Sequence, residues 1–256
     1  MSGWELAATV PPLAAGECQV WWARRADARA WHPQLLDGSE RGRLARLRRP
    51  VDQDRFMLAA SLLRIVLGAH LHEPPAAVEV IRTCPDCAQP HGKPRVARPG
   101  WECSVSHSGD RVAVAISRLG PVGVDVEEVA ERATLDSLID RVLASSEALE
   151  VRKLPACQQH RAFLTYWTRK EAVLKATGEG LRGGLTRIVV SAPHQPPRLL
   201  AAQGRPELVA RAALCSLHAG DGYEAALAVL GRPLVSVREL SASIVLSAPA
   251  PGVVPR

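Results

Sequence analysis

The stretch GPVGVDVEEV, Gly120 to Val129, predicts a β-strand whose two faces differ in chemistry. Because side chains alternate along a strand, Asp125 and Glu127 lie on one face. The opposite face carries only valines: Val122, Val124 and Val126. Two neighbouring carboxylates repel each other, and a hard divalent cation such as Mg²⁺, which commonly takes one or two carboxylates plus substrate phosphates, relieves that repulsion. The alternative is a solvated acidic strand end.

The segments on either side of this strand predict an α+β fold. Upstream, residues 101–117 (WECSVSHSGDRVAVAIS) have the pattern of a β-hairpin. In its second arm bulky residues alternate with small ones, so the small face could lie against a helix. Downstream, helical patterns occupy roughly residues 133–154 and 160–177. A helix-then-strands order occurs twice, around residues 54–117 and 160–230, which we interpret as architecture rather than as a sign of duplication.

The composition favours a globular protein with anionic partners. The net charge is +6 and the isoelectric point is near 9.3, which favours nucleic acid, an acidic protein or a phosphorylated small molecule as the partner. With only two Tyr and two Phe, the chain is poor in the rings that stack bases, so we predict no nucleic-acid partner, although six Trp weaken that argument.

Membrane and secretion signals are not evident in the sequence. No apolar run reaches 18 residues, and charge and proline interrupt the N-terminal stretch, so neither a membrane span nor a signal peptide is indicated. The six cysteines are too scattered for a secreted disulfide framework. We therefore predict a cytoplasmic protein with no membrane partner.

Lysine is rare in this chain, yet two lysines stand five residues apart in YWTRKEAVLKATGEG, Tyr166 to Gly180. Trp167, Glu171 and Lys175 follow i, i+4, i+8 spacing, which lines them along one helix face. Glu171 could reach the same metal as the strand carboxylates, and Lys175, a compact point charge, would lie near any phosphate bound there. Lys170 lies about 100° round the helix from Glu171, so it need not touch that phosphate. The alternative is an ordinary surface ion pair between Glu171 and Lys175.

Two further segments carry side chains suited to a phosphate site. In SVSHSGD, Ser106 and His107 offer a hydroxyl and an imidazole to phosphate oxygens. A serine hydrolase is not indicated, because no G-x-S-x-G motif occurs and adjacent residues of a strand point to opposite faces. In HGKP, Lys93 stands in a loop fixed by Gly and Pro, where a phosphate contact and an ordinary turn are equally plausible.

A separate cluster, Cys84, Cys87 and His91, has the spacing C-x2-C-x3-H and offers three zinc ligands. The fourth ligand is missing locally, and Cys103 is only a candidate for it. A structural zinc site is therefore one hypothesis, and free or disulfide-linked thiols are the alternative.

Taken together, GVDVEEV and WTRKEAVLK resemble the two signatures of 4′-phosphopantetheinyl transferases of the surfactin-synthetase-activating type. The family pattern is G-[IV]-D-[IV]-E followed later by W-[ST]-x-K-E-[AS]-x-x-K, and this chain satisfies both. HGKPRV and SVSHSGDRVAVAIS are similar to the family's G-K-P and S-H-S elements and stand in the same order. The resemblance covers about Lys93 to Lys175.

The resemblance implies two similar α+β halves related by a pseudo-twofold axis, with the active site in the cleft between them. We therefore expect an N-terminal half at residues 1–118, a C-terminal half at 119–240 and a flexible tail at 241–256. Such a pseudo-dimer implies a monomer. The implied reaction is the Mg²⁺-dependent transfer of 4′-phosphopantetheine from coenzyme A to a serine of an acyl or peptidyl carrier protein. It releases 3′,5′-ADP and serves polyketide, nonribosomal peptide or fatty acid biosynthesis.

The resemblance also implies roles for the acidic residues and the lysine. Asp125, Glu127 and Glu171 would hold Mg²⁺ on the coenzyme A pyrophosphate, and Lys175 would contact its phosphates. Glu171, directly or through a metal-bound water, would take the serine proton. Glu147 is a second candidate for the base or for a carrier contact.

For the coenzyme A nucleotide, the implied residues come mainly from the N-terminal half. His107 would contact the phosphates, and Ser106, Lys93 and Pro94 match positions that line the nucleotide site. Three arginines lie where the family carries basic residues for the 3′-phosphate: Arg41, Arg43 and Arg55.

Two rival functions use the same features. A Mg²⁺-dependent nuclease also needs acidic residues and a lysine, and a basic surface would suit it. A non-catalytic basic binding module is the third hypothesis. The basic charge fits the transferase as well, because carrier proteins are acidic and would be steered toward it.

Overall fold

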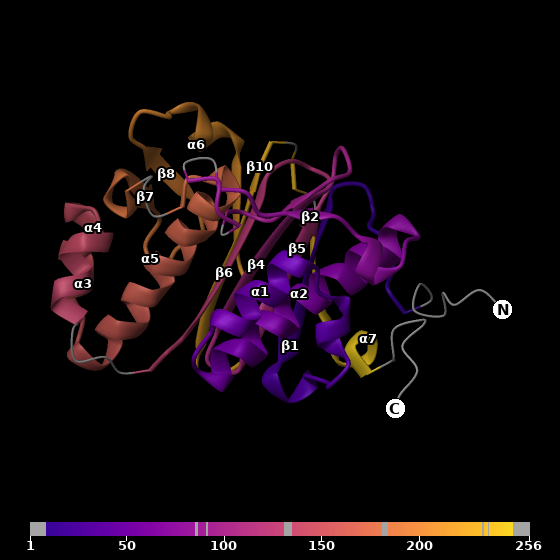
Figure 1. Cartoon of the computed structure of the whole chain (residues 1–256). Coiled ribbons are helices and arrows are strands. Elements are labelled where there is room, and N and C mark those ends of the chain that lie inside the picture. The colour runs from indigo at the N-terminus through magenta and orange to yellow at the C-terminus, as the bar shows by residue number, and fades with distance from the viewer. Residues whose placement is uncertain are drawn as a thin grey trace.

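The chain folds into four layers in the order helix, sheet, sheet, helix (Figure 1). The computed structural model describes residues 9–84, 87–90, 92–130, 135–180, 184–231, 233–234 and 236–247. The outer layers are two 22-residue helices, α2 (Pro50–Leu71) and α5 (Ala156–Thr177). Apolar clusters fill the space under each helix and between the sheets. The fold class is α+β, as the sequence predicted.

The first sheet has the strand order β11-β1-β5-β4. Its strands are β1 (Glu17–Arg24), β4 (Glu102–Ser108), β5 (Arg111–Ser117) and β11 (Ser236–Ser241). β4 and β5 form the predicted hairpin, and Gly109 at its turn has a φ of 54°, which suits glycine. The bulky face of β5 packs under α2. Its small face, Ala113 and Ala115, packs against the second sheet and not against a helix, because the neighbouring valine face of β6 needs a close partner.

The second sheet consists of β6 (Val122–Glu128), β10 (Tyr223–Leu230) and β9 (Ala212–Ser216), in that order. Its outer face is covered by α5. Gly123 on β6 permits the close approach, because a Cβ there would lie 2.0 Å from the Ala172 carbonyl oxygen of α5. The following turn of α5 therefore lies directly over Asp125.

The two sheets meet at the strand pair β4 and β6, which share no backbone ladder within the described strands. Serine hydroxyls of β4 accept hydrogen bonds from backbone N–H groups of β6 instead. The serines are at alternate positions: Ser104, Ser106 and Ser108. This seam joins the two sheets, each of which is covered by one long helix, and we call each sheet with its helix a half. The seam carries the predicted metal-binding carboxylates.

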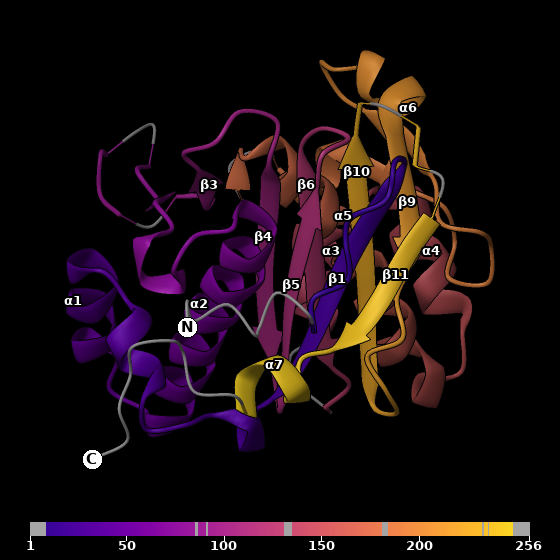
Figure 2. The same cartoon turned by 90° about the vertical axis from the view of Figure 1, so that its right-hand side faces the viewer.

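The C-terminal segment corrects the expectation of a flexible tail at 241–256. β11 pairs in parallel with β1, and α7 (Ser243–Ser247) follows it (Figure 2). Val245 and Leu246 are buried in the cluster beneath α2. The segment 236–247 therefore belongs to the first sheet and its core, so a boundary at 240 does not separate it from the N-terminal half. Residues 248–256 lie outside the described residues.

The helical pattern predicted for 133–154 is divided into α3 (Leu135–Val142) and α4 (Ser145–Lys153). Residues 131–134 lie outside the described ranges. The remaining elements are short: α1 (Gly38–Arg46), α6 (Glu207–Arg211), β2 (Val80–Ile81), β3 (Arg95–Val96), β7 (Ile188–Val190), β8 (Leu199–Ala202), and the 3-10 helices η2 (Arg25–Asp27), η3 (His32–Leu35), η4 (Pro75–Ala77) and η6 (Leu185–Arg187). Across the described part of the chain, no helix combines the length and the apolar character needed to cross a membrane.

Candidate functional site

A cavity of about 330 Å³ lies between the two halves, with walls from α2 and β4 on one side and from β6 and α5 on the other. One group of its lining side chains is polar or charged, and we call it the polar end: Ser106, His107, Asp125, Glu127, Glu171 and Lys175. A second group combines apolar side chains with two arginines, and we call it the arginine end: Arg43, Phe56, Ala59, Ala60, Arg82 and Pro94. We call this cavity the inter-half cleft. Its residues come from segments separated by more than a hundred positions in the sequence.

Asp125 and Lys175 form the centre of the polar end. Asp125 is buried, and its Oδ1 accepts hydrogen bonds from Lys175 Nζ at 2.6 Å and from Ser106 Oγ at 2.9 Å. Its other oxygen, Oδ2, is buried with no hydrogen-bond partner among the described residues. A buried carboxylate oxygen without a partner costs free energy, and a bound cation would remove that cost.

Glu171 adds a second buried carboxylate, one helical turn before Lys175. Its Oε1 also lacks a hydrogen-bond partner within the described part of the chain. Burial, with help from the negative charges of Asp125 and Glu127 and against the opposing charge of Lys175, raises the pKa of Glu171 to about 7. The protein thus concentrates negative charge that it does not itself neutralise in full.

These carboxylates fit a bound Mg²⁺ ion. Among the described residues, no three His, Cys, Asp or Glu side chains lie close enough together to hold a metal ion by themselves. Mg²⁺ usually keeps several waters and takes only one or two protein carboxylates, so it does not require such a group. Asp125 Oδ2 and Glu171 Oε1 are two buried oxygens of one cleft that find no hydrogen-bond partner in the described ranges, and oxygen is the donor that Mg²⁺ prefers.

Ser106 and His107 lie on β4 at the polar end of the cleft. Ser106 Oγ accepts a hydrogen bond from Lys175 Nζ at 2.9 Å and donates one to Asp125 Oδ1. The loss of water around the imidazole, assisted by the positive charge of Lys175 and by two arginines, lowers the pKa of His107.

The arginine end of the cleft contains one residue that sequence reasoning missed. Arg43, a predicted nucleotide contact, lies over the Phe56 ring at 4.9 Å. Arg82, after β2, lines the same cavity, and its buried Nε makes no hydrogen bond with the described residues although Glu40 Oε1 lies 3.8 Å away. Burial and the charge of Arg82 lower the pKa of Arg43. The strand period of AVEVIR, which puts Arg82 on the face of buried Val80, was the available signal.

Three basic residues expected at the nucleotide do not line the inter-half cleft as described. The Arg41 guanidinium donates to the Leu36 carbonyl oxygen. Arg55 Nε donates to Gly109 O at 2.8 Å. Lys93 Nζ donates to the carbonyl oxygen of Ala176 at 2.9 Å and lines a neighbouring cavity instead. Each of these cations donates to a backbone carbonyl oxygen, and Arg55 and Lys93 also pair with Asp52 and Glu102. Pro94 beside Lys93 does line the cleft.

Glu147, the second candidate for the base or for a carrier contact, is engaged in contacts within the protein. It is buried on α4, forms an ion pair with Lys170, and accepts hydrogen bonds from the backbone N–H groups of Ala144 and Val190. Lys170 is fully buried on α5. These contacts join α4 and β7 to α5, and the role of Glu147 as a base or carrier contact stays a prediction.

The zinc hypothesis receives no support. Cys84 is buried and Cys87 is exposed, so the two thiols occupy different environments. His91 lies outside the described residues, and within the described ranges no cluster of potential ligands is arranged around Cys84 and Cys87. A two-cysteine pair without a second pair does not complete the tetrahedral site that zinc requires.

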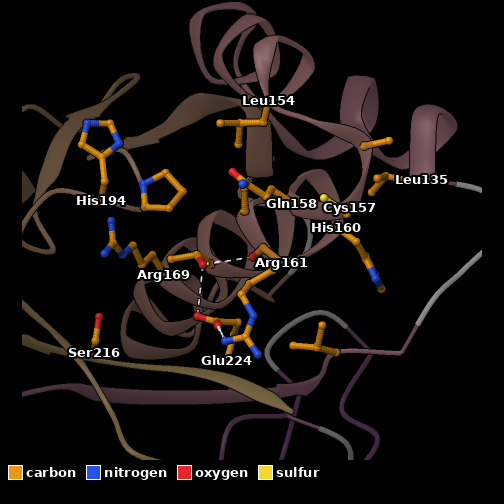
Figure 3. Close-up of a pocket in the computed structure, with 15 residues that line it drawn as sticks. Leu135, Leu154, Cys157, Gln158, His160, Arg161, Arg169, His194, Ser216 and Glu224 are labelled. Carbon is orange, nitrogen blue, oxygen red and sulfur yellow. Dashed lines mark hydrogen bonds and ion pairs between the residues drawn. The ribbon is translucent and has the colours of Figure 1, made fainter. Parts of the chain in front are cut away.

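A larger cavity, of about 1120 Å³, lies in the second half and is separate from the inter-half cleft (Figure 3). On one wall, Glu224 accepts hydrogen bonds from Arg161 at 2.6 Å and Thr165 at 3.0 Å. Glu224 is opposite Glu127 in the β10–β6 register, so the two cavities share a strand pair. None of the sequence-predicted site residues is among its described lining.

Comparisons with known proteins show which family the chain belongs to. Residues 121–228, which carry Asp125, Glu127, Glu171 and Lys175, match the sequence model of the 4′-phosphopantetheinyl transferase superfamily. The 4′-phosphopantetheinyl transferase HetI of Nostoc sp. is 30% identical over 200 residues, which are 77% of this chain and 79% of HetI. The chain belongs to the 4′-phosphopantetheinyl transferase superfamily.

Other members of the superfamily match over shorter lengths. The 4′-phosphopantetheinyl transferase psf-1 of Bacillus pumilus is 30% identical over 57% of this chain and 60% of its own length. A Synechocystis sp. relative, slr0495, is 33% identical over 60% of this chain and 62% of its own length. The chain thus matches about three fifths of the length of these two relatives. The holo-[acyl-carrier-protein] synthase of Thermotoga maritima has a TM-score of 0.36 and 26% identity over 44% of this chain and 64% of that protein.

Proposed function

We propose that this protein transfers the 4′-phosphopantetheine group of coenzyme A to a serine of an acyl or peptidyl carrier protein and releases 3′,5′-ADP. The observation that carries the proposal is the pair of buried carboxylate oxygens on Asp125 and Glu171, beside Lys175, that have no hydrogen-bond partner among the described residues, in a member of the superfamily. A site of this kind suits a pyrophosphate with a divalent cation.

Asp125, Glu127 and Glu171 would hold Mg²⁺ against the coenzyme A pyrophosphate. When bound, Mg²⁺ would neutralise the charge that develops on the phosphate oxygens during transfer. Lys175 Nζ, now on Asp125, would donate to the same phosphate oxygens, because a compact ammonium with three donors suits a single oxygen. The imidazole of His107 would add a further donor from the opposite wall of the cleft.

The nucleotide would lie toward the arginine end of the cleft. Arg43 and Arg82 place two positive charges there, and Phe56 offers an apolar ring beneath Arg43. Glu171, which lines the polar end, would accept the proton of the attacking carrier serine. The serine oxygen would then attack the β-phosphate, and the bond to 3′,5′-ADP would break.

The net charge of +6 supports an acidic partner such as a carrier protein, because complementary charge speeds encounter. The motif resemblance supports the surfactin-synthetase-activating type within the superfamily. A cytoplasmic location and a monomeric state stay predictions.

Incubation of the protein with coenzyme A, Mg²⁺ and a panel of apo acyl and peptidyl carriers tests the proposal. We expect the mass of at least one carrier to rise by one phosphopantetheine group, and we expect EDTA to prevent it. No mass gain on any carrier, together with Mg²⁺-dependent plasmid nicking by the same preparation, would reject the transferase in favour of the nuclease.

A further inference from the structure

The seam between β4 and β6 is built from hydroxyl groups at regular intervals. Ser104 Oγ accepts from Val124 N at 3.0 Å, Ser106 Oγ from Val126 N at 3.3 Å, and Ser108 Oγ from Glu128 N at 3.1 Å. The spacing in both strands is two residues, so every bond repeats the same geometry. Each serine thus replaces a backbone carbonyl as the acceptor.

Two of the three hydroxyls also bind a carboxylate. Ser106 Oγ donates to Asp125 Oδ1 at 2.9 Å, and Ser108 Oγ donates to Glu127 Oε2 at 2.8 Å. The residue in the corresponding place beside Ser104 is Gly123, which has no side chain. All three serines therefore make the same bond to the backbone of β6, but only Ser106 and Ser108 also bind a carboxylate.

Among the described residues, the hydroxyl proton of Ser108 has one hydrogen-bond acceptor, Glu127 Oε2. A serine hydroxyl has one donor and two acceptor positions. The backbone N–H of Glu128 donates to Ser108 Oγ and occupies one of its acceptor positions. The hydroxyl proton then points to Glu127 Oε2. A Glu side chain has several rotatable bonds, and this contact fixes one of its oxygens relative to the backbone of β6.

We propose that Ser108 is a positioning residue that orients the Glu127 carboxylate for the divalent cation of the cleft. The proposal rests on the proposed function for the identity of the ion. Ser108 touches neither the ion nor the substrate in this assignment; it acts through Glu127. Groups that hydrogen-bond a ligating carboxylate typically change metal affinity by about 10–100-fold when removed. Ser106 is less suited to such a test, because its hydroxyl also accepts a hydrogen bond from Lys175, so its removal would disturb two site residues at once.

The experiment compares Ser108→Ala, Ser108→Thr and the matched control Ser104→Ala in the full chain. Ser104→Ala removes the same kind of hydroxyl–backbone bond but no carboxylate contact. Free Mn²⁺ is measured by electron paramagnetic resonance while the protein is titrated into it, first alone and then with coenzyme A. Thermal unfolding of each variant is recorded without metal.

We expect Ser108→Ala to weaken Mn²⁺ binding by roughly 10–100-fold, Ser108→Thr to recover most of the loss, and Ser104→Ala to bind as the wild type does. Both alanine variants lose a bond to a backbone N–H, so both lower the melting temperature, and stability alone does not separate them. Unchanged Mn²⁺ affinity in Ser108→Ala would overturn the inference, as would an equal loss in Ser104→Ala.

The metal site and the positioning role of Ser108 are separated by different outcomes. Wild-type protein that binds Mn²⁺ and modifies a carrier, with Ser108→Ala indistinguishable from it, rejects the role of Ser108 and leaves the transferase proposal intact. Wild-type protein that binds no Mn²⁺, even with coenzyme A present, rejects the metal site itself and the positioning role with it.

Discussion

Replacement of Glu147 by Leu tests whether the buried pair between α4 and α5 is structural. Glu147 is 3% exposed and Lys170 0% exposed. Lys170 Nζ also donates to the carbonyl oxygens of Val142 and Leu185, each at 3.0 Å. Removing one partner of a buried ion pair leaves the other charge buried without compensation, which costs about 3–5 kcal/mol. For a chain of this size that corresponds to a melting temperature lowered by roughly 6–20 °C.

The assay is urea unfolding of Glu147→Leu, Lys170→Met and the double variant. Because the double variant buries no lone charge, we expect its loss of stability to be smaller than the sum of the two single losses, by about 1–3 kcal/mol. The control is Glu150→Gln on the same helix. Glu150 pairs with Lys153 at 2.9 Å, but both side chains are more than half exposed, so the change should cost less than about 1 kcal/mol.

Transfer activity decides the interpretation. At a temperature where Glu147→Leu remains folded, we expect its turnover on a carrier protein to stay close to that of the wild type. A variant that keeps its stability but loses turnover would refute the structural assignment and restore Glu147 as a catalytic candidate. Additive losses in the double variant would refute the coupling between the two charges.

Four further predictions concern the inter-half cleft. Without metal, the raised pKa of Glu171 means that the folded state binds a proton more tightly than the unfolded state, so the free energy of unfolding should fall by about 3 kcal/mol as pH rises from 4.5 to about 7. Urea unfolding across that range should show the slope in the wild type and its loss in Glu171→Gln; equal slopes would contradict the shift. Asp125→Ala should abolish transfer, measured by carrier mass, while circular dichroism stays native; normal turnover would remove it from the site. Lys175→Arg should lower kcat severely, because a planar fork does not replace a compact ammonium at one oxygen, and full activity would refute that reason. Gly123→Ala should lower both stability and transfer, because its Cβ meets the Ala172 carbonyl oxygen; a variant with wild-type unfolding and turnover would show that α5 yields freely.

Local patterns carried much of the fold. The alternation in residues 120–129 and 101–117 predicted β6 and the β4–β5 hairpin, because a strand with one buried face leaves a period of two in the sequence. The helical spacing of Trp167, Glu171 and Lys175 predicted that they share a face, and all three line the inter-half cleft. The C-terminal strand was missed, since its pairing partner is β1, more than two hundred residues away.

The sequence by itself determined which chemical groups are available and on which face of its own element each one stands. Only the tertiary structure decided which of them meet. Arg82, which follows β2, lines the cleft. Lys93 donates a hydrogen bond to the Ala176 carbonyl oxygen, and Glu147 forms an ion pair with Lys170. A charged side chain pairs with whatever partner folding brings near it, and burial then sets the cost of leaving it unpaired. Periodicity records the face of a helix or strand, but the partner on the opposing element is a long-range property that no local pattern contains.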